Sequence, residues 1–332
     1  MDPVQATNPL ADRRLALKLS IFAGLAALPP AVARAQERAL APPTRPLPVV
    51  DARFPAELAP GVFILPDKRI PLVPNVGIVV GRETVLVIDC GLGIESAENV
   101  LRAARELAPG RQVALTVTHA HPEHGFGAQV FKGQAHIFYN SAQRDHLARS
   151  GQSLLDGFRA AVLPPGQRHL LDGIVLTPPD LAYEVERARL DLGGREVQFR
   201  TYGTAHSPGD QIIVLPAERI VFAGDLIEER MFPIVPFFPP MIGADDIDLA
   251  RWEAALREIA GLQPRLIVPG HGNLGGPEIA EEVRRYFSEV GALVRSAGGG
   301  GEGLEARIRA QYPTWENSEF IASAVRYLSQ RG

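Results

Sequence analysis

The stretch His119-Ala120-His121-Pro122-Glu123-His124 places three histidines and one carboxylate within six residues. It follows a β-rich run, residues 113–118, which we predict to be a strand. Because alternate side chains of a strand point the same way, His119 and His121 can bind one cation together. Pro122 ends the strand, and Glu123 and His124 follow in a turn where they can hold a second cation. So dense a cluster predicts a metal site.

Three further segments each place one candidate ligand at the end of a β-rich run. They are Thr204–Asp210 with His206, Phe222–Asp225 with Asp225, and Val268–Gly272 with His271. Side chains on the loops where strands end can meet at one rim of a layered fold. We therefore expect these three residues to complete the metal site. Three other histidines stand alone and are expected to be ordinary structural or surface residues: His136, His146 and His169.

Short β-rich runs alternate with amphipathic helical stretches along the body of the chain. Strands are predicted at 62–65, 76–80, 85–88, 113–118, 135–139 and 266–268, and hairpins at 184–202 and 211–222. Helices are predicted at 94–107, after a cap at Ser141, at 246–259 and from Pro277 onward. This order favours one α/β domain in which two stacked sheets have helices on their outer faces.

The four ligand-bearing segments, in this order, resemble the metallo-β-lactamase superfamily over roughly residues 55–290. The first segment is similar to its Thr-His-x-His-x-Asp-His signature, with Glu123 where the family usually has Asp. Asp89-Cys90-Gly91 resembles its Asp-Thr-Gly turn. The resemblance implies a four-layer αββα sandwich. It also implies the ligand sets: His119, His121 and His206 on metal one, Glu123, His124 and His271 on metal two, and Asp225 bridging.

The resemblance implies a hydrolase with one or two zinc ions per chain, and iron and manganese also suit such ligands. A metal-bound hydroxide would attack a small-molecule substrate of the ester, thioester, lactone or amide type. Asp225 and Glu123 are the acids expected to act in catalysis, and Asp89 is expected to orient a ligand histidine. The extra methylene of Glu123 predicts a weakened, remodelled or empty second metal position.

Other functions fit the same residues. One is β-lactam hydrolysis, although Asp225 stands where one subclass of zinc β-lactamases has a cysteine. Another is an iron-dependent enzyme similar to persulfide dioxygenases, which needs a single metal. A third is a non-catalytic metal-binding protein that uses the apolar loop 231–242 as its contact surface. In that loop prolines alternate with apolar residues, which predicts a wall over the active site or a homodimer contact.

Residues 1–35 have the pattern of an export signal. Arg13-Arg14 precede an apolar stretch, the segment around them resembles a twin-arginine signal, and Ala33-Arg34-Ala35 supplies a small-residue cleavage site. Lys18 and Pro29-Pro30 leave an apolar core too short to span a bilayer. We expect a periplasmic protein with no stable membrane span after signal cleavage. The predicted segments after the signal are a linker at 36–54, a metallo-β-lactamase-like domain at 55–296, and a Gly-rich linker with a helical appendage at 297–332.

Composition narrows the partners. The formal net charge of -4 and the lack of a strongly basic tract argue against nucleic-acid binding. The single cysteine, Cys90, excludes an intramolecular disulfide and a cysteine-rich zinc site. Cys90 is expected to be a small buried hydrophobe.

Overall fold

The computed structural model describes residues 46–235, 246–298 and 303–330, and every element named below belongs to the compact unit Leu47–Gly332. The predicted export signal at 1–35 lies outside the described residues, as does most of the predicted linker at 36–54. Within the described ranges, no helix combines the length and the apolar character that a membrane crossing requires.

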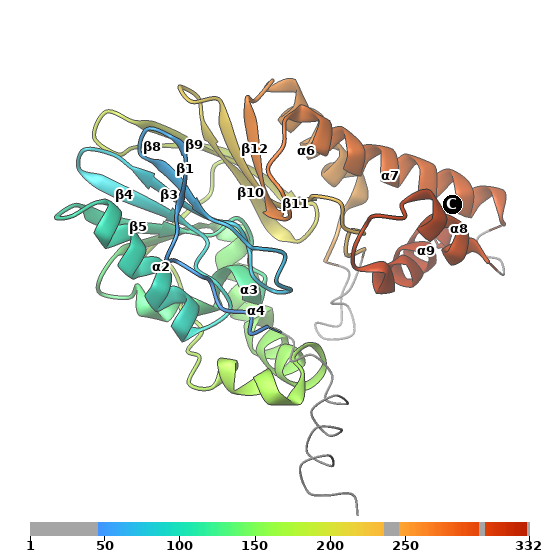
Figure 1. Ribbon diagram of the computed structural model, residues 1–332, viewed down its shortest axis with the longest axis horizontal. Coiled ribbons are helices and arrows are strands. Elements are labelled where there is room, and N and C mark those ends of the chain that lie inside the picture. Colours follow the sequence, from blue (N-terminus) through green and yellow to red (C-terminus); the bar gives the residue numbers. More distant parts are fainter. Residues whose placement is uncertain (1–45, 236–245, 299–302, 331–332) are drawn as a thin grey trace, which may run out of the picture. The chain divides into compact units, whose positions relative to one another are not determined.

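The first sheet contains seven strands that neighbour one another in chain order (Figure 1). Pairing is antiparallel from β1 to β4 and parallel from β4 to β7. A meander makes the antiparallel half, and helical crossovers make the parallel half. The strands are β1 (Ala56–Ala59), β2 (Val62–Leu65), β3 (Val76–Val80), β4 (Thr84–Ile88), β5 (Gln112–Thr116), β6 (His136–Asn140) and β7 (Leu181–Tyr183).

The second sheet has the order β12-β11-β10-β9-β8. Its β11–β12 pair is parallel, while the other pairs are antiparallel. The two predicted hairpins are confirmed as the pairs β8–β9 and β10–β11. The strands are β8 (Arg187–Asp191), β9 (Glu196–Thr204), β10 (Pro208–Leu215), β11 (Ile220–Glu228) and β12 (Leu266–His271).

The inner faces of the two sheets pack directly against each other. Ile64, Leu86 and Ile88 of the first sheet share one buried cluster with Phe199 and Phe222 of the second. Gly77 in β3 permits this approach, because a Cβ there would lie 2.6 Å from the Phe222 ring. The apolar residues of both sheets are therefore buried between them.

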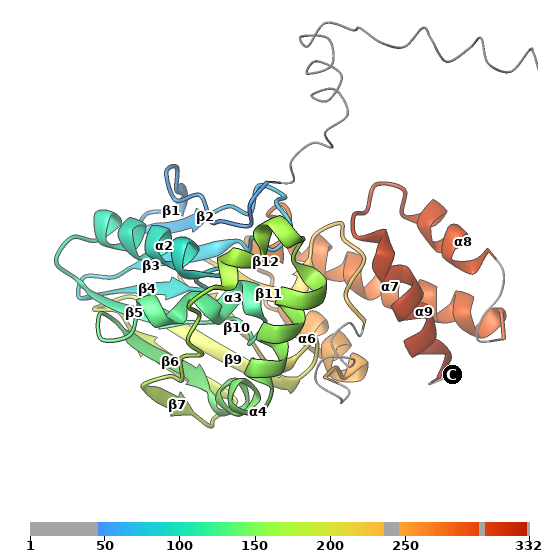
Figure 2. The ribbon, with the colours of Figure 1, turned by 90° about the horizontal axis from the view of Figure 1, so that it is seen from below.

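Helices cover the outer faces of both sheets (Figures 1 and 2). Helix α2 (Ile94–Leu107) buries Ala97, Val100, Leu101 and Ala104 against the first sheet, as its periodicity predicted. Helices α6 (Leu249–Gly261) and α7 (Pro277–Ser296) cover the second sheet. The predicted four-layer αββα sandwich is therefore confirmed.

Shorter elements lie at the rim of the sandwich. Helix α4 (Ser141–Gly157) follows β6, and the structure corrects its predicted cap. Asn140 rather than Ser141 is the cap, since its side chain accepts from the Gln143 amide and the Gln143 side chain accepts from the Asn140 amide. The other elements are α3 (Pro122–Gly125), η1 (Phe126–Val130), η2 (Phe158–Val162), η3 (Pro165–Leu171), α8 (Leu304–Gln311), η4 (Ser318–Phe320) and α9 (Ile321–Ser329).

The C-terminal helices pack into the same apolar cluster as α6 and α7. Phe232, the first phenylalanine of the predicted apolar loop 231–242, is fully buried, with its ring 5.9 Å from Tyr286 and 5.6 Å from Trp315. Val235 is also buried. The start of this loop is therefore internal packing, while residues 236–242 lie outside the described residues.

Candidate metal centre

The first four predicted ligands come from the segment after β5. That strand ends at Thr116, so the prediction of a strand up to Thr118 is wrong by two residues. His119 lies in the following loop, and His121 keeps an extended backbone as the residue before α3. Glu123 and His124 lie in the single turn of α3, which Pro122 begins.

The other three predicted ligands come from the second sheet. His206 lies between β9 and β10, and His271 is the last residue of β12. Asp225 lies inside β11, which continues to Glu228, so our expectation that the strand ends at this acid is wrong. The β11–β12 register shifts on both sides of Gly224, an irregularity that sequence periodicity does not reveal.

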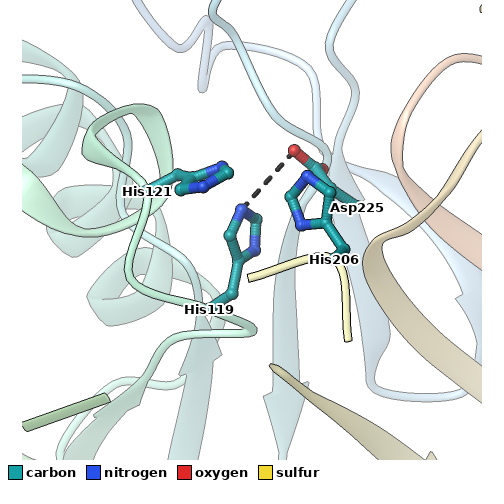
Figure 3. Close-up of side chains that lie close together, drawn as sticks. All are labelled: His119, His121, His206 and Asp225. Atoms are coloured by element: carbon teal, nitrogen blue, oxygen red, sulfur yellow. Dashed lines mark ion pairs between the residues drawn. The ribbon is translucent and has the colours of Figure 1, made fainter. Parts of the chain in front are cut away.

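These side chains form two adjoining buried clusters. Within each cluster one ligand atom of every residue lies within 4.8 Å of the others. Figure 3 shows the first cluster, in which the rings of His119 and His206 point toward Asp225. The first cluster contains His119, His121, His206 and Asp225, and the second contains Glu123, His124, Asp225 and His271.

Asp225 belongs to both clusters. Its Oδ2 lies 3.5 Å from His119 Nε2, and its Oδ1 lies 3.3 Å from His124 Nε2 and 3.7 Å from His271 Nε2. Gly270 makes room for this carboxylate, because a Cβ on Gly270 would lie 1.8 Å from Asp225 Oδ1. The arrangement matches the bridging position that the family resemblance implied for Asp225.

Polar partners orient His124 and His119 toward the clusters. Asp89 Oδ2 lies 2.9 Å from His124 Nδ1, which confirms that Asp89 orients a candidate ligand. The Thr118 hydroxyl lies 2.9 Å from the same Asp89 oxygen and 3.1 Å from His119 Nδ1. Since the hydroxyl has one proton to donate to Asp89, it accepts from His119 Nδ1–H. Both Nε2 atoms then face the clusters, where a bound cation would take the place of any proton on them.

His271 is also held by a hydrogen bond on Nδ1, and an acid lies near Nδ1 of His206. The Val73 carbonyl accepts from His271 Nδ1 at 3.0 Å, and Asp210 Oδ1 lies 3.6 Å from His206 Nδ1. Asp210 also fixes its own turn, because it accepts from the amides of Ala205 and Ser207 and from the Ser207 hydroxyl. The loop that carries His206 is therefore rigid before any metal binds.

Burial and mutual charge set the protonation of the site. Burial, with the charge of neighbouring histidines, holds the pKa values of His119 and His121 well below their ordinary value, so both are neutral as ligands must be. Burial opposes ionisation of Asp225, but the facing histidines, His124 first, hold its pKa well below the usual range. Asp225 is therefore an ionised carboxylate at neutral pH.

Several buried polar atoms of the two clusters have no hydrogen-bond partner among the described residues. They include His119 Nε2, His124 Nε2, His206 Nε2, Glu123 Oε2 and Asp225 Oδ1. Such atoms cost about 1–3 kcal/mol each when they stay unsatisfied, and divalent cations would satisfy them. Imidazole and carboxylate donors without sulfur suit zinc, iron or manganese. The residues present therefore fit a two-metal centre.

The substitution at position 123 does not keep the acid out of the second cluster. A Glu123 carboxylate oxygen lies within the 4.8 Å set formed with His124, Asp225 and His271. Burial raises the pKa of Glu123, so a bound cation would favour its ionised form. The longer side chain reaches the position that the family's aspartate would occupy.

Some residues of the site were not predicted from the sequence. Thr118, Asp210 and Gly270 flank predicted ligands directly, so their proximity in sequence was a usable signal. Val73 is far from the ligands in sequence, and only the fold brings its carbonyl to His271. Of the three histidines expected to be ordinary, His136 and His169 are exposed, whereas His146 is buried.

The fold and site have counterparts among known proteins. Residues 69–271 match the model of the Metallo-beta-lactamase superfamily. Since this match covers more than half of the chain, the chain belongs to the metallo-β-lactamase superfamily. The matched residues include all seven candidate ligands of the two buried clusters.

Its relatives differ in their named activities. A linear primary-alkylsulfatase from Pseudomonas sp. is 23% identical over 64% of this chain and 44% of its own length. A metallo-beta-lactamase type 2 from Bacteroides fragilis is 26% identical over 30% of this chain and 39% of its own length. The chain thus spans less than half the length of these two relatives. An acyl-coenzyme A thioesterase from Gallus gallus is 26% identical over 65% of this chain and 79% of its own length.

Solved structures share the fold. A beta-lactamase domain protein from Burkholderia ambifaria superposes with a TM-score of 0.60 at 21% identity, covering 86% of this chain and 91% of that one. A metallo-beta-lactamase family protein from Thermus thermophilus gives a TM-score of 0.58 at 20% identity, covering 83% and 95%. At these identities the likeness concerns the fold alone.

Proposed function

We propose that the protein is a zinc-dependent hydrolase of ester-type substrates, with thioesters of carboxylic acids as the first candidates. The observation that carries the proposal is the pair of buried ligand clusters that share Asp225. Bound zinc would supply a water of lowered pKa and a positive charge that stabilises the oxygen on which negative charge develops.

The chain's own residues prepare this chemistry in a definite way. Asp89 and Thr118 keep the protons of His124 and His119 on Nδ1, so that the Nε2 atoms are available to metal. Asp225, ionised and placed between the clusters, can accept a hydrogen bond from the attacking water and orient it. Glu123 adds a second carboxylate beside it.

Thioesters come first because the thioesterase relative matches 65% of this chain and 79% of its own length. Sulfate esters come second, because the alkylsulfatase relative matches a similar share of this chain. β-Lactams rank below both, since the match to the β-lactamase covers 30% of this chain.

A substrate panel tests the proposal. The zinc-loaded protein is assayed with an acyl thioester, a carboxylic ester, a lactone, an alkyl sulfate and a chromogenic cephalosporin. We expect thioester turnover that a chelator abolishes and zinc restores, that His119→Ala eliminates, and that exposed His136→Ala retains. Turnover of the cephalosporin alone would instead support a β-lactamase. Iron as the bound metal, with oxygen uptake in the presence of a persulfide, would support the dioxygenase alternative.

We also propose that the protein is exported to the periplasm, which the pattern of residues 1–35 supports. Cell fractionation and N-terminal sequencing of the secreted chain should find cleavage after Ala35. Replacement of Arg13 and Arg14 by lysine should block export if the route is the twin-arginine one. Retention of residues 1–35 in a cytoplasmic protein would contradict export.

A homodimer through the apolar loop remains a proposal for residues 236–242 alone, because Phe232 and Val235 are buried inside their own chain. Light scattering after size-exclusion chromatography should give twice the chain mass for the wild type. Replacement of Phe237 and Phe238 by serine should then give the monomer mass. A monomeric wild type would exclude this contact.

A further inference from the structure

Glu228 is a buried carboxylate at the end of β11, and neither the predicted ligand set nor the mechanism above uses it. It lies three residues after Asp225, and its side chain is 4% exposed. Its Oε2 has no hydrogen-bond partner among the described residues. The group is therefore buried in the ligand-bearing half of its strand without a protein partner for that oxygen.

Other acids near β11 are paired with arginines, in contrast to Glu228. Glu229 forms an ion pair with Arg69, and Glu218, just before β11 begins, forms one with Arg195 at 3.3 Å. None of the ion pairs in the described part of the chain includes Glu228. A buried carboxylate without a partner is costly, so folds tend to retain one where a ligand or a reaction uses it.

The strand pairing places Glu228 beside the metal centre. The parallel register of β11 and β12 aligns the Cα of Glu228 with that of the ligand His271. Its carboxylate interacts electrostatically with Asp225 and His206 of the first cluster and with Glu123 and His124 of the second. Burial, reinforced by Asp225, raises the pKa of Glu228 to about 8, although His206 and His124 act in the opposite direction.

Charge balance gives this position a use. The two clusters contain five histidines and two carboxylates, so with neutral histidines the ligands carry two negative charges. Two divalent cations would leave an excess of two positive charges in a buried site, and an ionised Glu228 would halve that excess.

We propose that Glu228 is a third carboxylate of the metal centre and that its charge increases the affinity of the clusters for divalent cations. This inference rests on the metal site and not on the substrate proposed above, so a failure of the substrate panel leaves it intact. Glu228 acts here on metal binding, and it has no assigned contact with substrate.

Zinc titration of the metal-free protein tests the inference, with a chromophoric chelator as competitor. We expect Glu228→Gln to weaken zinc binding about 10–100-fold, the range typical of groups that support metal ligands. Melting of the metal-free variant should be unchanged or higher in temperature, because the raised pKa keeps Glu228 largely protonated at neutral pH and glutamine resembles that neutral form. Glu218→Gln is the matched control: it removes a paired carboxylate before the other end of β11 and should leave zinc affinity within about twofold.

Two results would overturn the proposal. The first is zinc affinity in Glu228→Gln equal to that of the wild type, which would assign the side chain a role apart from metal. The second is a metal-free Glu228→Gln protein that melts well below the wild type or fails to fold, which would make Glu228 a structural residue. Glu228→Leu, which removes charge at similar length, should show the same loss of zinc affinity.

Discussion

Gly270 is the position where the smallest change should do the most damage to the metal centre. A methyl group there would lie 1.8 Å from Asp225 Oδ1, whereas Cβ contacts under 3.0 Å essentially do not occur. The carboxylate or the β12 backbone therefore has to move by about 1 Å or more in Gly270→Ala. Metal–oxygen distances tolerate only about 0.2 Å, so Asp225 would leave both clusters at once.

We expect Gly270→Ala to lower zinc affinity at least about 100-fold, because it displaces a ligand shared by both metals. At a fixed zinc concentration well above Kd, that loss removes about 2.7 kcal/mol of metal-dependent stabilisation. The assay is competitive zinc titration together with thermal melting at saturating and at negligible zinc. The melting temperature of the variant should respond much less to zinc than that of the wild type.

Gly261→Ala is the control for a glycine-to-alanine change. Gly261 ends α6, and a Cβ there meets nothing within 4 Å. Its zinc affinity should equal that of the wild type. If Gly270→Ala kept wild-type affinity and metal content, the steric argument and the bridging position of Asp225 would both be refuted.

Three further predictions concern single side chains. Asp89→Asn, which removes the charge behind His124 and tolerates the positive φ of 66° at this residue, should weaken zinc binding about tenfold; chelator competition measures this, and an unchanged Kd would contradict it. Glu123→Asp should leave two metals per chain, because Glu123 already reaches the second cluster; a rise from one metal to two on elemental analysis would show that it does not. His146 has a pKa lowered to about 4, chiefly by burial, so between about pH 6.5 and 4 the unfolded state binds a proton that the native state does not. Stability should therefore fall with pH in that window by up to about 1.4 kcal/mol per unit, and denaturation of metal-free His146→Gln should show a shallower fall; equal slopes would refute this.

The sequence predicted the ligands better than the groups that hold them. His119, His121 and His124 stand in one short motif, and His206, Asp225 and His271 each follow or occupy a β-rich run, so local pattern was sufficient. The partners Asp89 and Val73 reach their histidines only through sheet pairing and loop packing. Glu228 carried no local signal, since an acid near the end of a strand is usually exposed.

The same distinction holds for the fold. The buried strands and amphipathic helices were predicted because their apolar periodicity is strong. The strands β1 and β7 were missed, because both are short edge strands whose side chains are exposed or only partly buried. The run from Ile220 was predicted to stop before Asp225, because polar residues in a strand buried on both faces look like a strand end.

X-ray absorption at the zinc edge tests the two-cluster site most directly. The account predicts a first shell of nitrogen and oxygen only, because Cys90 is buried in the apolar cluster under α2 and belongs to neither ligand set. It also predicts a metal–metal path of about 3.5–4 Å, the separation typical of two-metal hydrolases, and loss of that path in Asp225→Ala. A sulfur ligand, or a wild-type spectrum without a metal–metal path at full loading, would contradict two adjoining metals that share Asp225.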